Sequence, residues 1–536
     1  MRAAGLHLIL VFLVSCGSLF GQHAKAMIPV SSELYWYLDT LYIEAGRTVV
    51  NTARPWSYDE FYFQLNKIVV SSLSPAGRQL QQRLLGMVTP SSPQGFSAAI
   101  DVLLKPEIFT HLHLQSSAVP ADAEYQWQHG YMQRSPLLEI PLEFFLRDSL
   151  YLLIHATIKE ERDSVIAGNY SNLVFDDPGL WVDAYFPFTA YTASGGPNWS
   201  FLFGRNQYSW GNGRSGNLIL GNVVNYIDGA SLAFWGDTLK FSTLYAAFED
   251  AYGLTDSNPP QEFNSGYQAF LGHRLDIQVH PKVSLALFEA LMFGGEPGNL
   301  VQDLNFAMIF HNWNDIPRMN SIFSVEANIN PWNYCNLYGQ FALDEFATKY
   351  EADLDGGGGP AVYGWLAGLD LRIPLDKAYL SFVTEYAYTS PWLYNRRQQP
   401  YFYATHRYWS MTNTRNGAVS LPLGYTYGSD AVVWYNSLQY RLPGKASLAL
   451  NIEYRQQGEK GYLSSWQAAE GDTAPMSPAP VKTTTVHIAT SYQLLGWLSL
   501  QTNLYYIHSS NYLHIAGSQS QDMELSLLAA ISSPWW

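Results

Sequence analysis

The sequence predicts an all-β transmembrane barrel of about 18 antiparallel strands, preceded by a small N-terminal α-helical domain on the periplasmic side. Three observations predict it. Apolar and polar residues alternate with a period of two over most of the chain, short turns alternate with long polar stretches, and the last strand ends on Trp535 and Trp536. From that last segment alone, a membrane strand and an ordinary amphipathic strand of a soluble β-domain are equally acceptable interpretations.

Length and composition narrow the class of protein. The chain has 536 residues, which suits a large barrel with a small extra domain. Charged residues make up 14% and aromatic residues 15%, a composition that excludes general disorder. The formal net charge is −15 and the sequence contains no basic cluster, which argues against a nucleic-acid partner.

Residues 1–26 are predicted to be a signal peptide. Arg2 provides its positive start, residues 6–13 its apolar segment, and Ala24-Lys25-Ala26 its cleavage motif. A competing interpretation is a lipoprotein signal in which Cys16 is lipidated. No later apolar run approaches the ~18 residues of a spanning helix, so an exported chain that crosses a membrane would have to do so as a barrel.

Residues 27–97 are predicted to form the helical periplasmic domain. Helices are expected over 33–45, from Ser57 to about Val70, and from Ser74 to about Gly86. Gly46 is a stop signal, the segment 57–60 is a capping box, and Ser74 with Pro75 is an N-cap followed by proline in the first turn. Three short helices bury little core alone, so we expect them to pack on the barrel.

Residues 98–536 are predicted to form the outer-membrane barrel. Regular alternation is clear in 323–329, 446–454, 498–506 and 522–531. The polar face of these strands carries mainly Ser, Asn, Gln and Tyr, whereas the solvent face of a soluble sandwich is usually rich in Lys and Glu. This polar face therefore favours a barrel lumen.

Turns and loops follow the asymmetry of an outer-membrane barrel. Short turns are expected at 146–149, 279–282 and 441–445, and long extracellular loops at 161–198, 351–360, 395–430 and 458–482. The last strand is expected to close the barrel by pairing with the first strand, near 102–114.

The segment from Gly204 to Asn222 is the densest motif, since two arginines flank an aromatic ring among several glycines. In one interpretation Trp210 covers the face of an acidic sugar while Arg205 or Arg214 binds its carboxylate. In the other, the segment is a structural bend whose arginines pair with carboxylates of the lumen.

This segment and several others along the chain resemble, in their order, the motifs of the Wzi-type capsule assembly proteins of bacterial outer membranes. The resemblance covers most of the chain and includes 34–46, 54–56 and 80–85 of the head, the segment from Gly204 to Asn222, and the acidic pair Asp344-Glu345. The further candidates for carbohydrate-binding or lumen residues are His273, Arg274, Glu289 and Glu385.

The resemblance implies a barrel of about 18 strands with a periplasmic helical bundle, and a lectin-like protein that holds capsular polysaccharide at the cell surface. The implied partners are outer-membrane lipid, surface polysaccharide and the machinery that inserts barrels into the membrane. No cofactor is expected. The alternative function is a porin through which small solutes diffuse.

The sequence contains candidates for two further classes of site. Glu289, Asp344, Glu345 and Glu385 are candidates for the paired carboxylates of a glycoside hydrolase, but charges inside a barrel more often brace its wall, and the resemblance implies no chemistry. His111 and His113 share one face of a strand and no third metal ligand is evident nearby. The sequence therefore predicts neither an enzyme nor a metal site.

Overall fold

A computed structural model describes residues 23–90, 95–116, 127–130, 133–159, 169–172, 189–248, 267–295, 319–345, 361–395, 403–409, 417–461 and 478–532. The predicted terminal Trp535 and Trp536, and nearly all of the predicted signal peptide, lie outside these residues.

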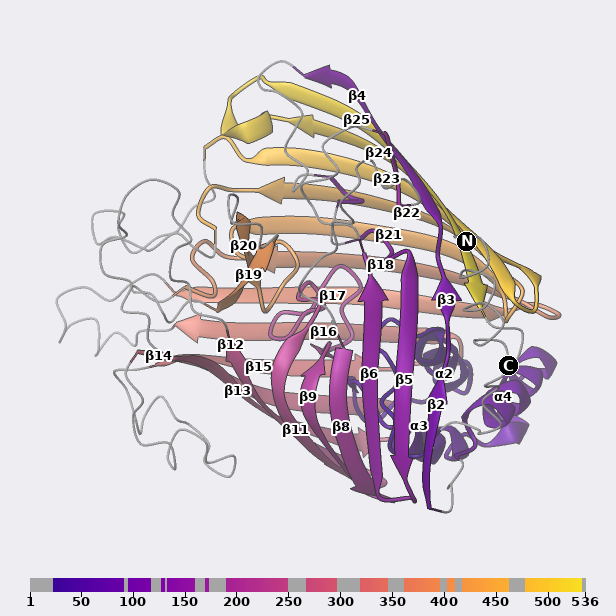
Figure 1. The fold of residues 1–536 in the computed structure, drawn as a ribbon. Helices are drawn as coiled ribbons and strands as arrows, with labels where there is room; N and C mark the ends of the chain where they lie inside the picture. Colours follow the sequence, from indigo (N-terminus) through magenta and orange to yellow (C-terminus); the bar gives the residue numbers. More distant parts are fainter. Residues whose placement is uncertain are drawn as a thin grey trace, which may run out of the picture.

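The chain forms a closed barrel of 18 antiparallel strands (Figure 1). Its first strand consists of three successive pieces. In chain order the barrel strands are β2 (Phe96–Ile100), β3 (Leu103–Leu104), β4 (Glu107–Ser116), β5 (Leu138–Leu146), β6 (Leu150–Ile158), β8 (Thr189–Gly196), β9 (Trp199–Asn206), β11 (Ile227–Trp235), β12 (Leu239–Phe248), β13 (Tyr267–His280), β14 (Val283–Gly295), β15 (Met319–Ile329), β16 (Cys335–Glu345), β17 (Val362–Pro374), β18 (Tyr379–Thr389), β21 (Ala431–Leu442), β22 (Ala446–Gln457), β23 (Val481–Leu495), β24 (Leu498–Ser510) and β25 (Gln519–Ser532). A short strand, β7 (Asn169–Ser171), pairs with β4.

The last strand closes the barrel on the first, as predicted. Strand β25 pairs with β3 through Ile531 and Ser532, and then with β4 as far as Ser520 opposite Ser116. Strand β3 also pairs with β5, so the first strand joins the two ends of the sheet. We call the contact between β4 and β25 the seam.

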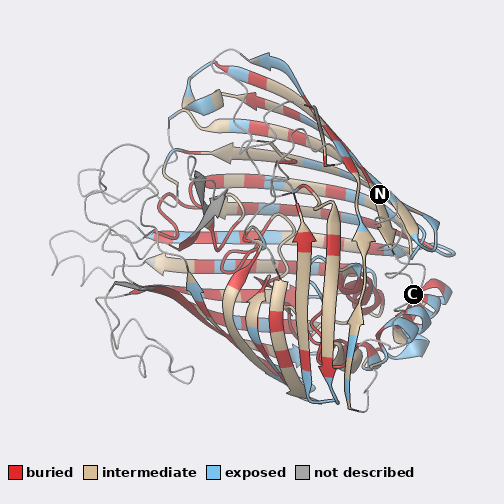
Figure 2. Ribbon diagram, viewed as in Figure 1, coloured by how far each residue is buried: buried red, intermediate tan, exposed pale blue. Residues whose placement is uncertain are grey.

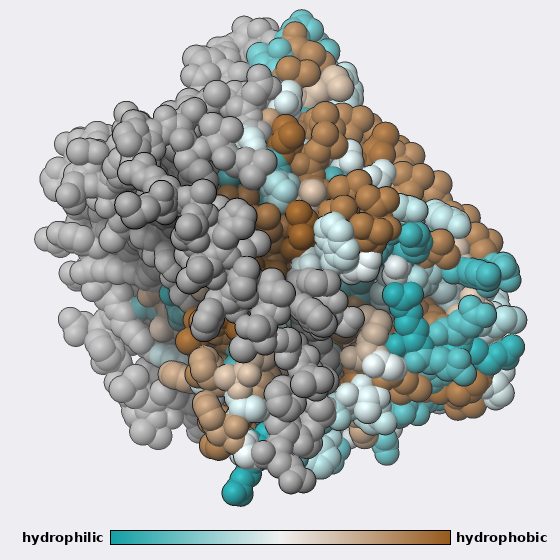
Figure 3. All heavy atoms as spheres, turned by 45° about the vertical axis from the view of Figure 1, so that its right-hand side comes forward, coloured by the Kyte–Doolittle hydropathy of each residue, from teal (hydrophilic) through white to brown (hydrophobic). Residues whose placement is uncertain are grey.

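The two faces of the wall differ in polarity. In β22, Leu448, Leu450 and Ile452 are exposed on the outside, and Asn451 and Glu453, which alternate with them, face the lumen. Figure 2 shows this alternation of buried and exposed residues along the strands, and Figure 3 shows apolar side chains gathered over the barrel wall. An apolar outer band with a polar interior is the pattern of a barrel in lipid.

The helices lie at the end of the barrel that carries the short turns. The backbone N–H of Thr48 donates to the carbonyl of Pro281 between β13 and β14. Lys67 Nζ donates to the carbonyl of Asp237 between β11 and β12, and Arg83 Nη1 to that of Pro443 between β21 and β22. The connections at the other end, such as 511–518 between β24 and β25, therefore lie on the side that faces outward in outer-membrane barrels.

Three α-helices are present among the described residues: α2 (Glu33–Glu44), α3 (Tyr58–Asn66) and α4 (Pro75–Val88). The predicted N-caps of α3 and α4 are present. Ser57 Oγ accepts from the N–H of Glu60, and Ser74 Oγ accepts from that of Gly77. Helix α3 ends four residues before the predicted Val70, because the β-branched run 68–70 disfavours helix and passes into a 3-10 turn, η1 (Val70–Ser72). Helix α4 continues two residues beyond Gly86. No described helix is long and apolar enough to cross a membrane.

The head is docked to the barrel by buried polar contacts. Glu60 of α3 and Lys240 of β12 form an ion pair at 2.6 Å, and their side chains are 1% and 2% exposed. Burial raises the pKa of Glu60, against the opposing effect of the Lys240 ammonium. Glu44 of α2 accepts from the hydroxyl of Tyr379 at the start of β18. Because these contacts are buried, they hold the helices in one fixed place at the barrel mouth.

The residues just before the head are also packed. Ala24 and Ala26 are buried, and their carbonyls accept from the N–H groups of Asp59 and Tyr58. Lys25 forms an ion pair with Asp59. The predicted cleavage after Ala26 would remove these contacts.

Two predicted loops contain regular structure. Strand β8 occupies the end of the predicted loop 161–198, because β6 and β9 pair with it on both sides although its sequence is rich in small residues. Within 395–430, β19 (Ala404–Trp409) and β20 (Gly417–Pro422) form a separate hairpin.

Candidate functional site in the barrel lumen

The connection between β9 and β11, residues 207–226, folds into the lumen. Its strand β10 (Ser209–Trp210) pairs with β1 (Ala53–Arg54), which precedes α3, so the head and the connection meet inside the barrel. Trp210 is 4% exposed, and its ring lies 5.0 Å from that of Phe288 of β14. We call residues 207–226 the plug loop.

Two glycines give the plug loop its path. Gly211 and Gly216 have φ angles of +140° and +152°. A Cβ at Gly211 would lie 2.2 Å from Nε2 of Gln340, and one at Gly216 would lie 2.9 Å from the backbone nitrogen of Thr426. Only glycine combines a positive φ with the absence of a Cβ.

Glu385 anchors the middle of the plug loop. Its carboxylate accepts from the backbone N–H groups of Arg214 at 2.7 Å and Ser215 at 2.8 Å, and from the hydroxyl of Tyr338 at 2.8 Å. The Arg214 guanidinium pairs with Asp370 at 2.8 Å. Glu385 is therefore an acceptor for the loop backbone, and Arg214 is held against the wall.

A second buried network joins the head to β13 and β15. Arg274 is 2% exposed and pairs with Asp276 at 2.8 Å and with Glu326 at 3.3 Å. Its Nη2 also donates to Thr52 of the head at 2.7 Å. This network braces the lumen and leaves no exposed guanidinium surface for a ligand.

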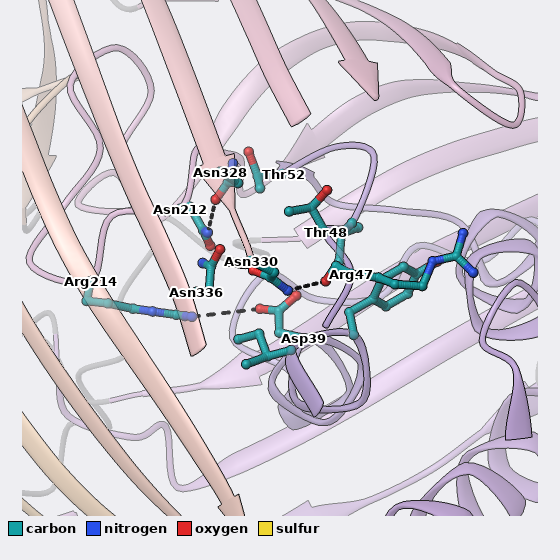
Figure 4. Close-up of a pocket in the computed structure, with 12 residues that line it drawn as sticks. Asp39, Arg47, Thr48, Thr52, Asn212, Arg214, Asn328, Asn330 and Asn336 are labelled. Carbon is teal, nitrogen blue, oxygen red and sulfur yellow. Dashed lines mark hydrogen bonds and ion pairs between the residues drawn. The ribbon is translucent and has the colours of Figure 1, made fainter. Parts of the chain in front are cut away.

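A small polar cavity lies between the head and the plug loop (Figure 4). Asp39 of α2 faces Arg214 across it at 3.9 Å, and Asn212 donates to Asn328 on one side. Its volume is ≈ 20 Å³. Since about 10–15 Å³ is needed for one water, this cavity holds about one water molecule and no sugar.

The plug loop belongs to a continuous apolar cluster that fills one half of the lumen. The cluster contains inward-facing residues of every long strand from β5 to β21, among them Phe145, Tyr191, Leu202, Leu244, Phe270, Ile322, Leu366 and Val433. On the outward side, Tyr394 and Tyr403 donate to the carbonyls of Leu218 and Ile219. We call this region the packed half.

The other half of the lumen, bounded by β22 to β25 and β4, holds a cavity of ≈ 510 Å³. None of the described members of the apolar cluster comes from these strands. The cavity is reached at the end with the long connections, since Tyr512 and His514 of the β24–β25 connection line it. We call this region the open half.

The lining of the open-half cavity combines aromatic, cationic and amide groups. The Arg455 guanidinium lies 4.1 Å from the centre of the Tyr427 ring, and Trp127 stacks on His111 at 4.2 Å. Gln457 and Tyr512 complete this part of the wall. Flat rings beside amide and guanidinium donors suit the ring faces and hydroxyl groups of sugars.

The capsule assembly protein Wzi family model matches residues 182–523. This match spans well over half of the chain. The chain belongs to the Wzi capsule assembly family. The sequence-based resemblance is thereby confirmed, and the match includes the plug loop and most of the barrel.

One solved structure supports the fold, and two others are more distantly similar. Wzi of Escherichia coli, described as an outer-membrane protein of group 1 capsule assembly and a carbohydrate-binding β-barrel, matches with a TM-score of 0.58 at 12% identity, over 95% of this chain and 99% of that one. The OccK5 (OpdH) protein of Pseudomonas aeruginosa matches with a TM-score of 0.41 at 8% identity, over 81% and 98% of the two chains. The DcaP channel of Acinetobacter baumannii matches with a TM-score of 0.35 at 10% identity, over 82% and 99%. No functionally curated protein matches the sequence.

This Wzi-family barrel is an outer-membrane protein, and most of the residues predicted for its site have structural roles. Trp210, Arg214, Arg274 and Glu385 are engaged in the packed half, as described above. Asp344 accepts from the N–H of Tyr394 at 2.7 Å. Glu345 belongs to β16, and its side chain lies outside the described residues.

Three predicted lumen residues face outward instead. Arg205 shares the side of β9 with the exposed Phe203, and pairs with Asp228 at 2.8 Å. His273 and Glu289 are directly opposite each other in β13 and β14, on the side that carries the exposed Leu287. The structure thus places these three candidates on the outer face of the wall, which the sequence could not decide because a single register step sets the face of a strand.

Sequence reasoning did not single out the open-half cavity. Tyr427, Arg455, Gln457 and Tyr512 are spread over separate strands and connections, without a local motif. The signal that could have found them is the small polar inward face of β22 to β25, which leaves space that the large inward residues of the packed half do not.

Proposed function

We propose that this Wzi-family barrel binds a surface polysaccharide in the open-half cavity and retains it at the cell surface. The observation that supports the proposal best is the cavity itself, with its size, its aromatic and guanidinium lining, and its place at the outward end of the barrel. The name of the Escherichia coli relative, a carbohydrate-binding barrel, agrees with a glycan as the ligand.

The proposed role is non-enzymatic. Among the carboxylates predicted for hydrolysis, Glu385 and Asp344 accept backbone N–H groups, and Glu289 faces outward. A glycoside hydrolase needs two carboxylates on either side of one bond. The predicted carboxylates among the described residues therefore give no support to hydrolysis.

A porin is the alternative function, and the packed half argues against it. Arg214, Asp370 and Glu385 fix the plug loop to the wall, and the apolar cluster continues from β5 to β21. We expect purified protein in planar bilayers to show no stable large channel. Stable channels of porin size with the head in place would favour solute transport over polysaccharide retention as the function.

Binding can be tested on full-length protein folded in detergent, with polysaccharide extracted from the surface of the bacterium that encodes the chain. Tyr512→Ala and Arg455→Ala should each weaken binding by about two- to tenfold, since one aromatic or cation–π contact contributes roughly 0.5–1.5 kcal/mol. Tyr506→Ala is the matched control because Tyr506 lies in the same hairpin and is exposed on the outer face.

Two results would contradict the proposal. One is equal binding by Tyr512→Ala, Arg455→Ala and the Tyr506→Ala control. The other is unchanged retention of surface polysaccharide in cells that lack the gene. Loss of binding in the control alone would place the glycan on the outer wall.

A further inference from the structure

We propose that His111, His113 and Asp522 form a binding site for a divalent transition-metal ion, with zinc as the representative ion, at the seam of the barrel. The two histidines come from the first strand and the aspartate from the last. A bound ion would thus join the two ends of the sheet. The inference does not depend on glycan binding.

The register of the seam brings these side chains together. Asp522 is directly opposite His113, and Glu524 is directly opposite His111. On β4 the exposed Leu112 and Leu114 face outward, and on β25 the exposed Leu525 and Leu527 do so. Since side chains alternate along a strand, all four polar residues face the lumen.

The donor atoms converge on a small volume. Oδ1 of Asp522 lies 2.6 Å from Nδ1 of His113 and 3.2 Å from Nε2 of His111. The three donor atoms all lie within 4.8 Å of one another. Ligand atoms around a tetrahedral zinc ion, with bonds of about 2.0–2.1 Å, are about 3.3 Å apart, so small side-chain rotations would accommodate an ion.

Neighbouring groups orient two of the three ligands, Asp522 and His111. Ser520 donates to the second carboxylate oxygen of Asp522 at 2.9 Å. On the far side of the His111 ring, Glu524 Oε1 lies 3.4 Å from Nδ1, and Trp127 stacks on the ring face. A carboxylate behind a histidine is the usual support of a histidine that binds a metal ion.

The donor set selects the class of ion. Two imidazole nitrogens and one carboxylate oxygen suit zinc and other first-row transition metals, whereas magnesium and calcium prefer oxygen ligands alone. All three residues line the open-half cavity, and 29% of the His113 side chain is exposed. A water or another small ligand from the cavity can therefore complete the coordination.

The test uses full-length, tag-free protein in detergent, stripped with a chelator and titrated with Zn²⁺ against a chromophoric chelator. We expect one tightly bound Zn²⁺ per chain, and Co²⁺ at the same site should give the visible absorption bands of a tetrahedral ion. His113→Gln and Asp522→Asn should each remove this binding. Glu524→Gln should weaken it by about 10–100-fold, as supporting carboxylates do.

His487→Gln is the matched control. His487 lies on β23, is half-buried, and contacts Asn451 and Asn503 instead of the cluster. The His487→Gln variant should bind Zn²⁺ as the unmodified protein does. Heat-dependent mobility in gels verifies that each variant is a folded barrel.

Two outcomes would overturn the proposal. The first is the absence of stoichiometric Zn²⁺ binding by the unmodified protein, which would leave a seam joined by hydrogen bonds only. The second is unchanged binding by His113→Gln and Asp522→Asn, which would locate the ion elsewhere. If Asp522→Asn does not fold, His113→Gln decides alone, because His113 is the most exposed of the three ligands.

Discussion

The packed and open halves of the lumen are built from the same antiparallel hairpins but differ in their inward side chains. In β13 to β18 these include large apolar groups such as Phe270, Phe288 and Tyr338, which close on the plug loop. In β22 to β25 they include Asn451, Thr483, Asn503 and Ser526, and a cavity of ≈ 510 Å³ remains. The comparison teaches that one continuous wall can hold a rigid brace on one side and a binding space on the other.

The largest predicted effect concerns the contact that holds the head against the packed half. Lys240→Ala leaves Glu60 buried without its cation, and should lower the free energy of unfolding by about 3–5 kcal/mol. Urea unfolding in lipid vesicles, followed by tryptophan fluorescence, measures it. Lys67→Ala is the control, since its partner Asp237 is 87% exposed, and should change the free energy by less than about 1 kcal/mol. Equal effects of both substitutions would show that the head is not docked as described.

The second prediction concerns the anchor of the plug loop. Glu385→Ala removes the acceptor of two backbone N–H groups and of the Tyr338 hydroxyl, and should cost about 1–3 kcal/mol of stability. The loosened loop should also raise the conductance measured in planar bilayers. Glu385→Gln keeps one carbonyl acceptor, so its stability and conductance should lie between those of Glu385→Ala and the unmodified protein. Unchanged conductance in Glu385→Ala would mean that the apolar cluster holds the loop without its polar anchor.

A smaller effect tests where the mature chain begins. If the mature chain keeps Lys25, Lys25→Ala breaks the pair with Asp59 and should lower stability by about 1–2 kcal/mol. If cleavage occurs after Ala26, the substitution has no effect on the mature protein. Mass spectrometry of the protein isolated from membranes gives the same answer independently.

The smallest effect is expected in the open half. Thr483→Val removes a hydroxyl contact of 3.0 Å with Ser509 at the cavity wall, and should cost about 0.5–1 kcal/mol because water in the cavity can replace the lost partner. The same urea titration measures it. A loss of stability as large as that of Glu385→Ala would show that the open half contributes as much to barrel stability as the packed half does.

Much of the fold could be predicted from the sequence. The strands around 323–329, 446–454 and 498–506, the closing pair of first and last strands, and the helix caps at Ser57 and Ser74 all depend on local patterns. Strand β8 was missed because its small residues show no alternation, and only its two neighbours define it.

The candidate sites could be predicted only in part. Arg205 and Arg214 both pair with carboxylates, as one of the two interpretations of their segment expected, but Arg205 is on the outer face, because register is set by pairing and not by composition. His111 and His113 were recognised as a pair without a third ligand. That ligand, Asp522, is 409 residues away from His113 and is adjacent to it only after the barrel closes.

The sequence by itself determined the class of the protein, since alternation, caps, turns and the family motifs are properties of neighbouring residues. The tertiary structure alone decided which face each charged residue occupies, which half of the lumen is filled, and which side chains meet at the seam. The physical reason is that closure of a barrel places residues from the two ends of the chain side by side, and no local pattern records that contact.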